Sequence, residues 1–71
     1  MSKEKKLRNY LLYKYIKFGK LKPVVAMQKV SIDLDLPDDD IIHPNNIKTI
    51  IDRYNNYTLR DINKLIKLET K

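Results

Sequence analysis

The chain of 71 residues contains no cysteine, and it has only one histidine and one glycine. Without cysteine, disulfide bonds, thiolate zinc sites and cysteine catalysis are excluded. The single histidine, His43, excludes a zinc site built from histidines, and Gly19 alone cannot make a glycine-rich phosphate loop. No Ser nucleophile lies in a recognisable motif with His43. We therefore expect no enzymatic activity and no cofactor.

Long apolar runs are also missing. No segment approaches the roughly 20 apolar residues of a membrane-spanning helix, so the sequence predicts no membrane span. Lys14 and Lys17 interrupt the apolar pattern near the N-terminus, which is not typical of a secretory signal peptide. We expect a protein of the nucleus or cytoplasm, and not a secreted one.

The short length predicts one small helical binding domain over residues 1–71. A core of this size rarely supplies more than about 3–5 kcal/mol of net stability, and small domains usually add a disulfide, a metal or a partner. Because the sequence excludes the first two, we expect a larger protein assembly or a homo-oligomer.

The formal charge of +6 is unevenly distributed along the chain. Residues 1–22 carry eight basic side chains and one Glu, a net charge of +7, whereas residues 23–45 carry one Lys and five Asp, a net charge of −4. Residues 46–71 carry a net charge of +3. Basic surfaces attract nucleic acid, anionic lipid or acidic protein. The bias toward Lys, Ile, Asn and Tyr is also typical of AT-rich genomes, which weakens this argument.

Hydrophobic periodicity predicts an all-α fold, a small bundle of three to four short helices. A helix over 3–19 has Gly19 as its expected C-cap, a second runs from Pro44 to about 55, and a third covers 58–69 behind a Thr58–Asp61 capping box. The predicted core comprises Leu7, Leu11, Leu12, Tyr15, Ile16, Phe18, Ile47, Ile50, Ile51, Tyr54, Leu59, Ile62, Leu65 and Ile66.

Residues 24–36 are ambiguous. Pro23 is well placed as the first residue of a helix, but Val30, Ile32 and Leu34 alternate with polar residues as in a strand. We favour a short helix followed by a short extended segment at about 30–36. Residues 37–43 are a loop by composition.

Two lysine-bearing helix faces are candidate nucleic-acid-binding surfaces. Lysines can meet phosphates, and tyrosines can stack on exposed bases. A solvated helix face is the competing interpretation of both. The candidate residues are Lys6, Tyr10, Tyr13, Lys14 and Lys17 on the first helix, and Arg60, Lys64 and Lys67 on the last.

Two DNA-binding folds and a calcium site remain as weaker interpretations. A helix-turn-helix across Asn55 and Asn56 lacks the usual Gly, and a ribbon-helix-helix would direct Asp33 and Asp35 toward phosphates. The acidic run from Asp33 has neither the Gly nor the Glu that an EF-hand loop needs. A solvated acidic loop fits this run better.

Two segments together resemble the MRG-binding protein family, whose members are subunits of histone acetyltransferase complexes. The first is Phe18-Gly19-Lys20-Leu21-Lys22-Pro23-Val24, which is similar to an apolar helix followed by a Lys-Pro-Val/Ala turn. The second is Ile47-Lys48-Thr49-Ile50-Ile51-Asp52-Arg53-Tyr54-Asn55, in which Ile47 stands for the family's Trp, and Tyr54-Asn55 for its Tyr-Asp. The family's histidine- and aromatic-rich stretch after the turn is absent. The resemblance implies a scaffold subunit that joins a chromodomain-type MRG protein to an acetyltransferase.

The sequence therefore predicts a non-enzymatic protein-interaction subunit of a nuclear, chromatin or other nucleoprotein assembly. The alternatives are a small basic DNA- or RNA-binding regulator and a ribosome-associated factor. Apolar residues in excess of the predicted core are the candidate partner-binding residues: Val24, Val25, Met27, Ile41 and Ile42.

Overall fold

The computed structural model describes residues 2–70 as a small helical fold, and no strand occurs within that range. The α-helices are α1 (Lys3–Tyr13), α2 (Pro23–Leu34), α3 (Pro44–Arg53) and α4 (Leu59–Glu69). A π-helix, η1 (Lys14–Phe18), continues α1, and a 3-10 turn, η2 (Asp38–Asp40), lies between α2 and α3. The predicted all-α bundle is confirmed.

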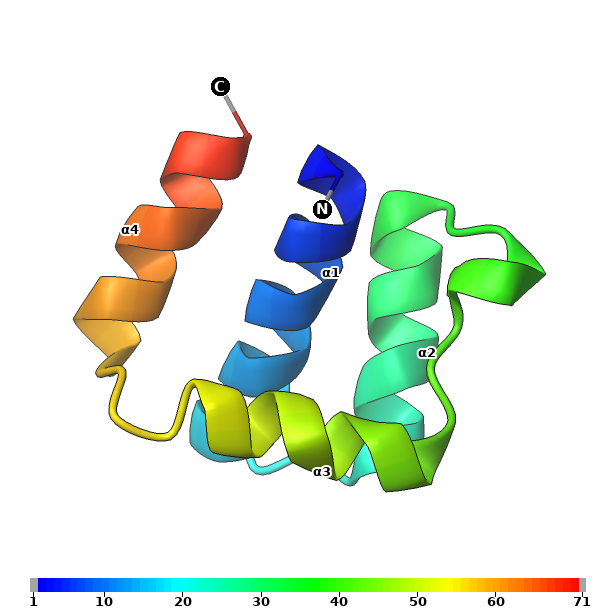
Figure 1. The fold of residues 1–71 in the computed structure, drawn as a ribbon, viewed down its shortest axis with the longest axis horizontal. Helices are drawn as coiled ribbons and strands as arrows, with labels where there is room; N and C mark the ends of the chain where they lie inside the picture. Colours follow the sequence, from blue (N-terminus) through cyan, green and yellow to red (C-terminus); the bar gives the residue numbers. More distant parts are fainter. Residues whose placement is uncertain (1, 71) are drawn as a thin grey trace.

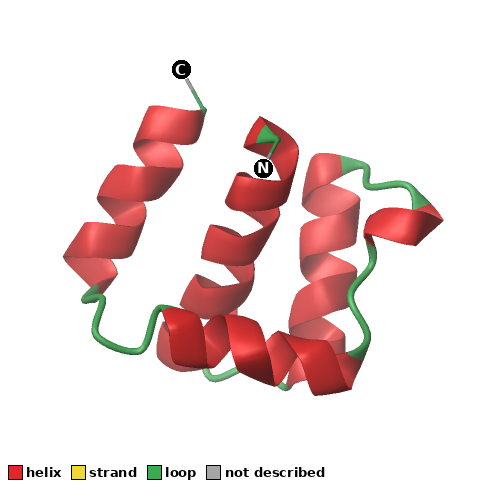
Figure 2. Ribbon diagram, in the orientation of Figure 1, coloured by secondary structure: helices red, strands yellow, loops and turns green. Residues whose placement is uncertain are grey.

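The helices α4, α1 and α2 lie side by side with α1 in the middle, and α3 crosses one end of this layer (Figure 1). Figure 2 shows the loops that join the helices. Because α1 lies in the middle of the layer, it packs against all three other α-helices, whereas α4 packs mainly along α1 and η1. The central position of α1 means that two of its sides are covered.

Two groups of buried side chains hold the layer together. The first joins α1, α2 and α3, and its buried members are Leu12, Ala26, Met27, Val30, Ile47 and Ile50. The second joins α1 to α4 through Tyr10, Tyr13 and Ile62. Ile51 and Tyr54 of the α3 region pack against both groups. These two residues therefore connect the halves of the core.

The expected extended segment at about 30–36 is wrong, because α2 continues to Leu34. Ala26, Met27 and Val30 have helical spacing and are buried, whereas Ile32 is 79% exposed. In the helix, Ile32, one of the alternating apolar residues that suggested a strand, therefore faces solvent. The ribbon-helix-helix interpretation loses the strand that it requires.

The end of α2 explains why the apolar residues beyond it need no strand. Asp35 has φ 51°, and its N–H donates to the carbonyl of Ile32 at 3.4 Å. The N–H of Leu36 donates to the carbonyl of Ser31 at 3.1 Å. These two bonds are those of a Schellman motif, with Asp in the left-handed position that Gly usually takes.

The N-terminal ends of α3 and α4 follow the predicted signals. Pro44 is the first residue of α3, and Nδ1 of His43 accepts the N–H of Asn45 at 3.2 Å. Thr58 and Asp61 form the capping box of α4 through reciprocal bonds of 3.1 and 3.2 Å. The hydrogen bonds that the Asp61 carboxylate receives from the backbone and side chain of Thr58 lower its pKa, so the cap keeps its carboxylate charge at neutral pH.

Gly19 ends the first helix by a different mechanism from the predicted one. Its φ is −82°, so it is not left-handed, and Lys20 takes the positive φ of 60° instead. The N–H of Gly19 donates to Lys14 O, and that of Leu21 to Tyr15 O, at 3.0 and 3.1 Å. A Cβ on Gly19 would lie 2.6 Å from Tyr15 O. Glycine is required because the backbone approaches so closely.

We expect Gly19→Ala to destabilise the fold by about 1–3 kcal/mol, the usual cost of forcing extra atoms into a packed site. Lys20→Gly is the matched comparison, because it relieves the left-handed backbone at the neighbouring position. Thermal unfolding followed by circular dichroism measures both. If Gly19→Ala is as stable as the wild type, the close approach at Tyr15 O is not a constraint.

Candidate binding surfaces

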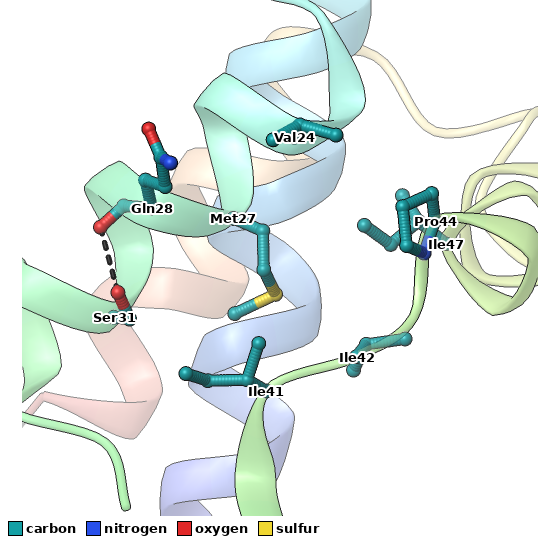
Figure 3. A pocket seen from close by; sticks show the side chains of 8 residues that line it. All are labelled: Val24, Met27, Gln28, Ser31, Ile41, Ile42, Pro44 and Ile47. Atoms are coloured by element: carbon teal, nitrogen blue, oxygen red, sulfur yellow. Dashed lines mark hydrogen bonds between the residues drawn. The ribbon is translucent and has the colours of Figure 1, made fainter. Parts of the chain in front are cut away.

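An apolar groove lies between α2 and the segment that connects η2 to α3. Its volume is about 230 Å³. Figure 3 shows the lining side chains: Val24, Met27, Gln28 and Ser31 from α2, Ile41 and Ile42 from the connecting segment, and Pro44 and Ile47 from the start of α3. Four of the five candidate partner-binding residues therefore meet in one place. Val25 is 46% exposed but is not among the lining residues.

The rims and the floor of the groove differ in exposure. Val24 and Ile41 are 52% and 46% exposed, whereas Met27 and Ile47 are buried. Met27 was expected at the partner surface, but it belongs mainly to the core, because its side chain packs in the group that includes Leu12 and Val30. The rim residues are thus free to contact another molecule while the floor supports the fold.

Arg8 of α1 binds the chain next to the groove wall that is formed by Ile41 and Ile42. Its Nη1 donates to the carbonyl oxygen of Asp40 at 2.9 Å, and its Nε donates to Oδ1 of Asn9 at 3.1 Å. Burial lowers the pKa of Arg8, and the charge of Asp40 opposes that shift. Arginine stays protonated at any physiological pH. The contact therefore anchors η2, and with it the start of the segment that carries Ile41.

The tyrosines of the predicted nucleic-acid face on α1 are inaccessible. Tyr10 is 9% exposed and Tyr13 is 0% exposed, and the Tyr13 hydroxyl donates to the carbonyl of Tyr57 at 2.7 Å. Burial raises the pKa of both phenols. Placing these two residues on a base-stacking surface was wrong, because the packing of α4 covers this side of α1.

The lysines of the same face are also partly engaged. Lys6, Lys14 and Lys17 are half-buried, and the ammonium of Lys17 donates to Oδ1 of Asn55 at 2.9 Å. Long basic side chains commonly cover apolar surface with their stems while the charge stays in water. With the tyrosines buried, α1 does not present the mixed lysine and tyrosine surface that the sequence predicted.

The basic stripe of α4 is exposed as predicted. Arg60, Lys64 and Lys67 are all exposed, and their spacing places them on one side of the helix. A second hollow of about 430 Å³ lies beside them, lined by Asn56, Tyr57, Asp61, Lys64, Leu65 and Leu68. No sequence pattern indicated this hollow, because it forms only where Asn56 and Tyr57 of the turn before α4 fold next to four residues of that helix.

The acidic run from Asp33 to Asp40 does not form a metal site. Within residues 2–70, no three His, Asp or Glu side chains are grouped so that they could hold a metal ion. Asp33 instead accepts the hydroxyl of Tyr15 at 3.0 Å, and Asp40 lies beside Arg8. The acidic side chains are therefore tied to the basic N-terminal helix or face solvent.

None of the helices described for residues 2–70 is long and apolar enough to cross a membrane. Comparison of the chain with models of known protein families, with curated proteins and with solved structures finds no match.

Proposed function

We propose that this chain is a non-enzymatic protein-interaction module that binds an apolar segment of a larger partner in the groove between α2 and the segment connecting η2 to α3. The observation that carries the proposal is the exposure of Val24 and Ile41 on opposite rims of one apolar hollow. Apolar residues gathered in a concave surface are typical of a binding site.

The charge around the groove selects the chemistry of the partner. Both walls come mainly from residues 23–45, whose net charge is −4 although the whole chain carries +6. Asp38 and Asp39 are exposed in η2, directly before Ile41. Electrostatic complementarity favours a partner of opposite sign. The proposed partner segment therefore has apolar residues that enter the groove and basic residues beside them.

The small size of the core supports the same proposal. The core is divided into two small groups, and only nine hydrophobic residues of the range 2–70 are buried. Domains of this size commonly depend on a partner for part of their stability. Binding to the folded state alone would raise the apparent stability according to mass action.

The wider assembly is a further part of the proposal, and it derives from the sequence resemblance. A nuclear, chromatin or other nucleoprotein assembly is the proposed setting, and an MRG-type chromodomain protein is the partner that the resemblance implies. The first segment that carries the resemblance runs from the last residue of η1 through the following turn to the start of α2, and the second covers most of α3 and the two residues after it.

Affinity purification from native lysate tests the proposal with two matched variants. Val24→Asp places a charge on the groove rim, and Ile32→Asp makes the same kind of change on α2 outside the groove, at a residue that is 79% exposed. We expect a discrete partner that survives nuclease, is retained by Ile32→Asp, and is lost with Val24→Asp. Equal recovery with both variants would mean that the groove does not bind the partner.

A further inference from the structure

We infer that the outer face of α4 binds single-stranded nucleic acid, with phosphates along Arg60, Lys64 and Lys67 and one base in the hollow beside Tyr57. This site is separate from the apolar groove and does not depend on the function proposed for it. The hollow lies between the turn after α3 and the exposed side of α4, whereas the groove lies on α2.

The basic side chains of α4 indicate where the sugar-phosphate backbone of the nucleic acid would lie. Arg60, Lys64 and Lys67 are exposed on one side of the helix. Of the two acidic residues of α4, Glu69 is only partly exposed. Its negative charge adds to the effect of burial in raising the pKa of Tyr10. Asp61 is held in the capping box with Thr58, and its charge also interacts with Arg60 and Lys64. The three basic side chains outnumber these two carboxylates, so the stripe keeps a net positive charge for phosphates, for which Lys and Arg supply most of the binding energy.

The hollow is suited to a base rather than to a phosphate. The pKa of Asp61 is lowered, first by its hydrogen bonds with Thr58, so an ionised carboxylate lines the hollow and repels phosphate. Leu65, Leu68 and Tyr57 are the apolar and aromatic residues of the lining, and Asn56 is its amide-bearing residue. Its volume of about 430 Å³ lies within the range of pockets that hold small organic molecules. Lys64 belongs both to this lining and to the basic stripe.

Tyr57 is exposed, yet its backbone and ring are held in place. Its carbonyl oxygen accepts the hydroxyl of buried Tyr13 at 2.7 Å, and its ring lies edge-on to Tyr54 with centroids 5.5 Å apart. The residue is still 40% exposed. A pre-positioned aromatic ring next to a basic stripe is the arrangement that binds single strands, because bases in a duplex are not free to stack on a side chain.

Fluorescence anisotropy with a labelled oligothymidylate of about 12 nucleotides tests the inference on the full chain. Three phosphate contacts predict a loss of affinity of about twentyfold between about 50 and 200 mM salt. The variant Arg60→Gln/Lys64→Gln/Lys67→Gln should bind weakly and lose most of this salt dependence. The control Lys5→Gln/Lys22→Gln/Lys48→Gln removes the same charge from exposed residues elsewhere, and it should keep most of the affinity.

Tyr57→Leu separates base binding from charge. It keeps the backbone acceptor for Tyr13, so the variant should fold, and circular dichroism checks this. Loss of stacking should lower the affinity about tenfold without changing the slope of the salt dependence. Any one of the following results would overturn the inference: no effect of Tyr57→Leu, an equal loss in both triple variants, or equal affinity for duplex DNA. Polyglutamate that competes as well as unlabelled oligonucleotide would also overturn it, since the surface would then bind any polyanion.

Discussion

Ile50→Asp is expected to unfold the domain. Ile50 is 7% exposed and packs in the core group that joins α1, α2 and α3. The substitution removes apolar packing and places a carboxylate among apolar side chains, where an uncompensated charge costs about 3–5 kcal/mol. A core of this size supplies about the same amount in total. The cooperative thermal transition and the helical circular dichroism signal of the wild type should both be lost at 25 °C.

Ile32→Asp is the matched control for this prediction. It introduces the same change into a residue that is 79% exposed, where surface substitutions usually alter stability by no more than about 0.5 kcal/mol. Its position near the end of α2 adds a small unfavourable interaction with the helix dipole. The variant should keep its cooperative transition with a midpoint lowered by a few degrees. A folded Ile50→Asp protein would show that the core is assigned incorrectly.

Tyr54→Ala is expected to have the second largest effect on stability. The ring of Tyr54 lies edge-on to Tyr10, Tyr13 and Tyr57, with centroid distances of 5.6, 6.0 and 5.5 Å. Truncating a packed aromatic residue costs about 3–5 kcal/mol, and a partly exposed ring should fall at the lower end. Chemical denaturation should therefore give a loss of about 3 kcal/mol, most of the stability that the domain has.

Tyr54→Phe keeps the ring and removes only the hydroxyl. Because the aromatic contacts depend on the ring, this variant should lose less than about 1 kcal/mol. Amide hydrogen exchange adds a local measurement. In Tyr54→Ala, protection should fall first in α4, because the group around Tyr13 and Ile62 joins that helix to α1. A loss confined to α2 would contradict this division of the core.

The predictability of each helix followed the strength of its local signals. Pro44, Thr58 and Asp61 specify helix starts through their own backbone and side-chain bonds, so the sequence was sufficient for α3 and α4. The C-terminal part of α2 has no comparable signal, and its position depends on burial of Val30 in the core group that also contains Leu12 of α1. The π-helix η1 depends on the close approach of Gly19 to Tyr15, which periodicity does not encode.

The contrast between local sequence signals and packing between helices also explains which surface residues could be placed from the sequence. Val24, Ile41 and Ile42 were found from the sequence because they exceeded the predicted core, and folding brings them together with Met27 in the groove. Tyr10 and Tyr13 were misplaced because tyrosine occurs at both surfaces and interiors, and only the position of α4 buries them. The resemblance to the MRG-binding protein family stays a prediction.

Site-specific photo-crosslinking tests the central claim most directly. A photoreactive amino acid would replace Val24 on the groove rim, and a matched protein would carry it at Ile32 on the same helix, where the exposure is 79%. The purified assembly would be irradiated, and the linked partner peptide sequenced by mass spectrometry. Our account predicts a crosslink from position 24 but not from position 32, to a peptide with apolar residues flanked by Lys or Arg. Equal crosslinking at both positions, or crosslinking at position 24 to an acidic peptide, would contradict it.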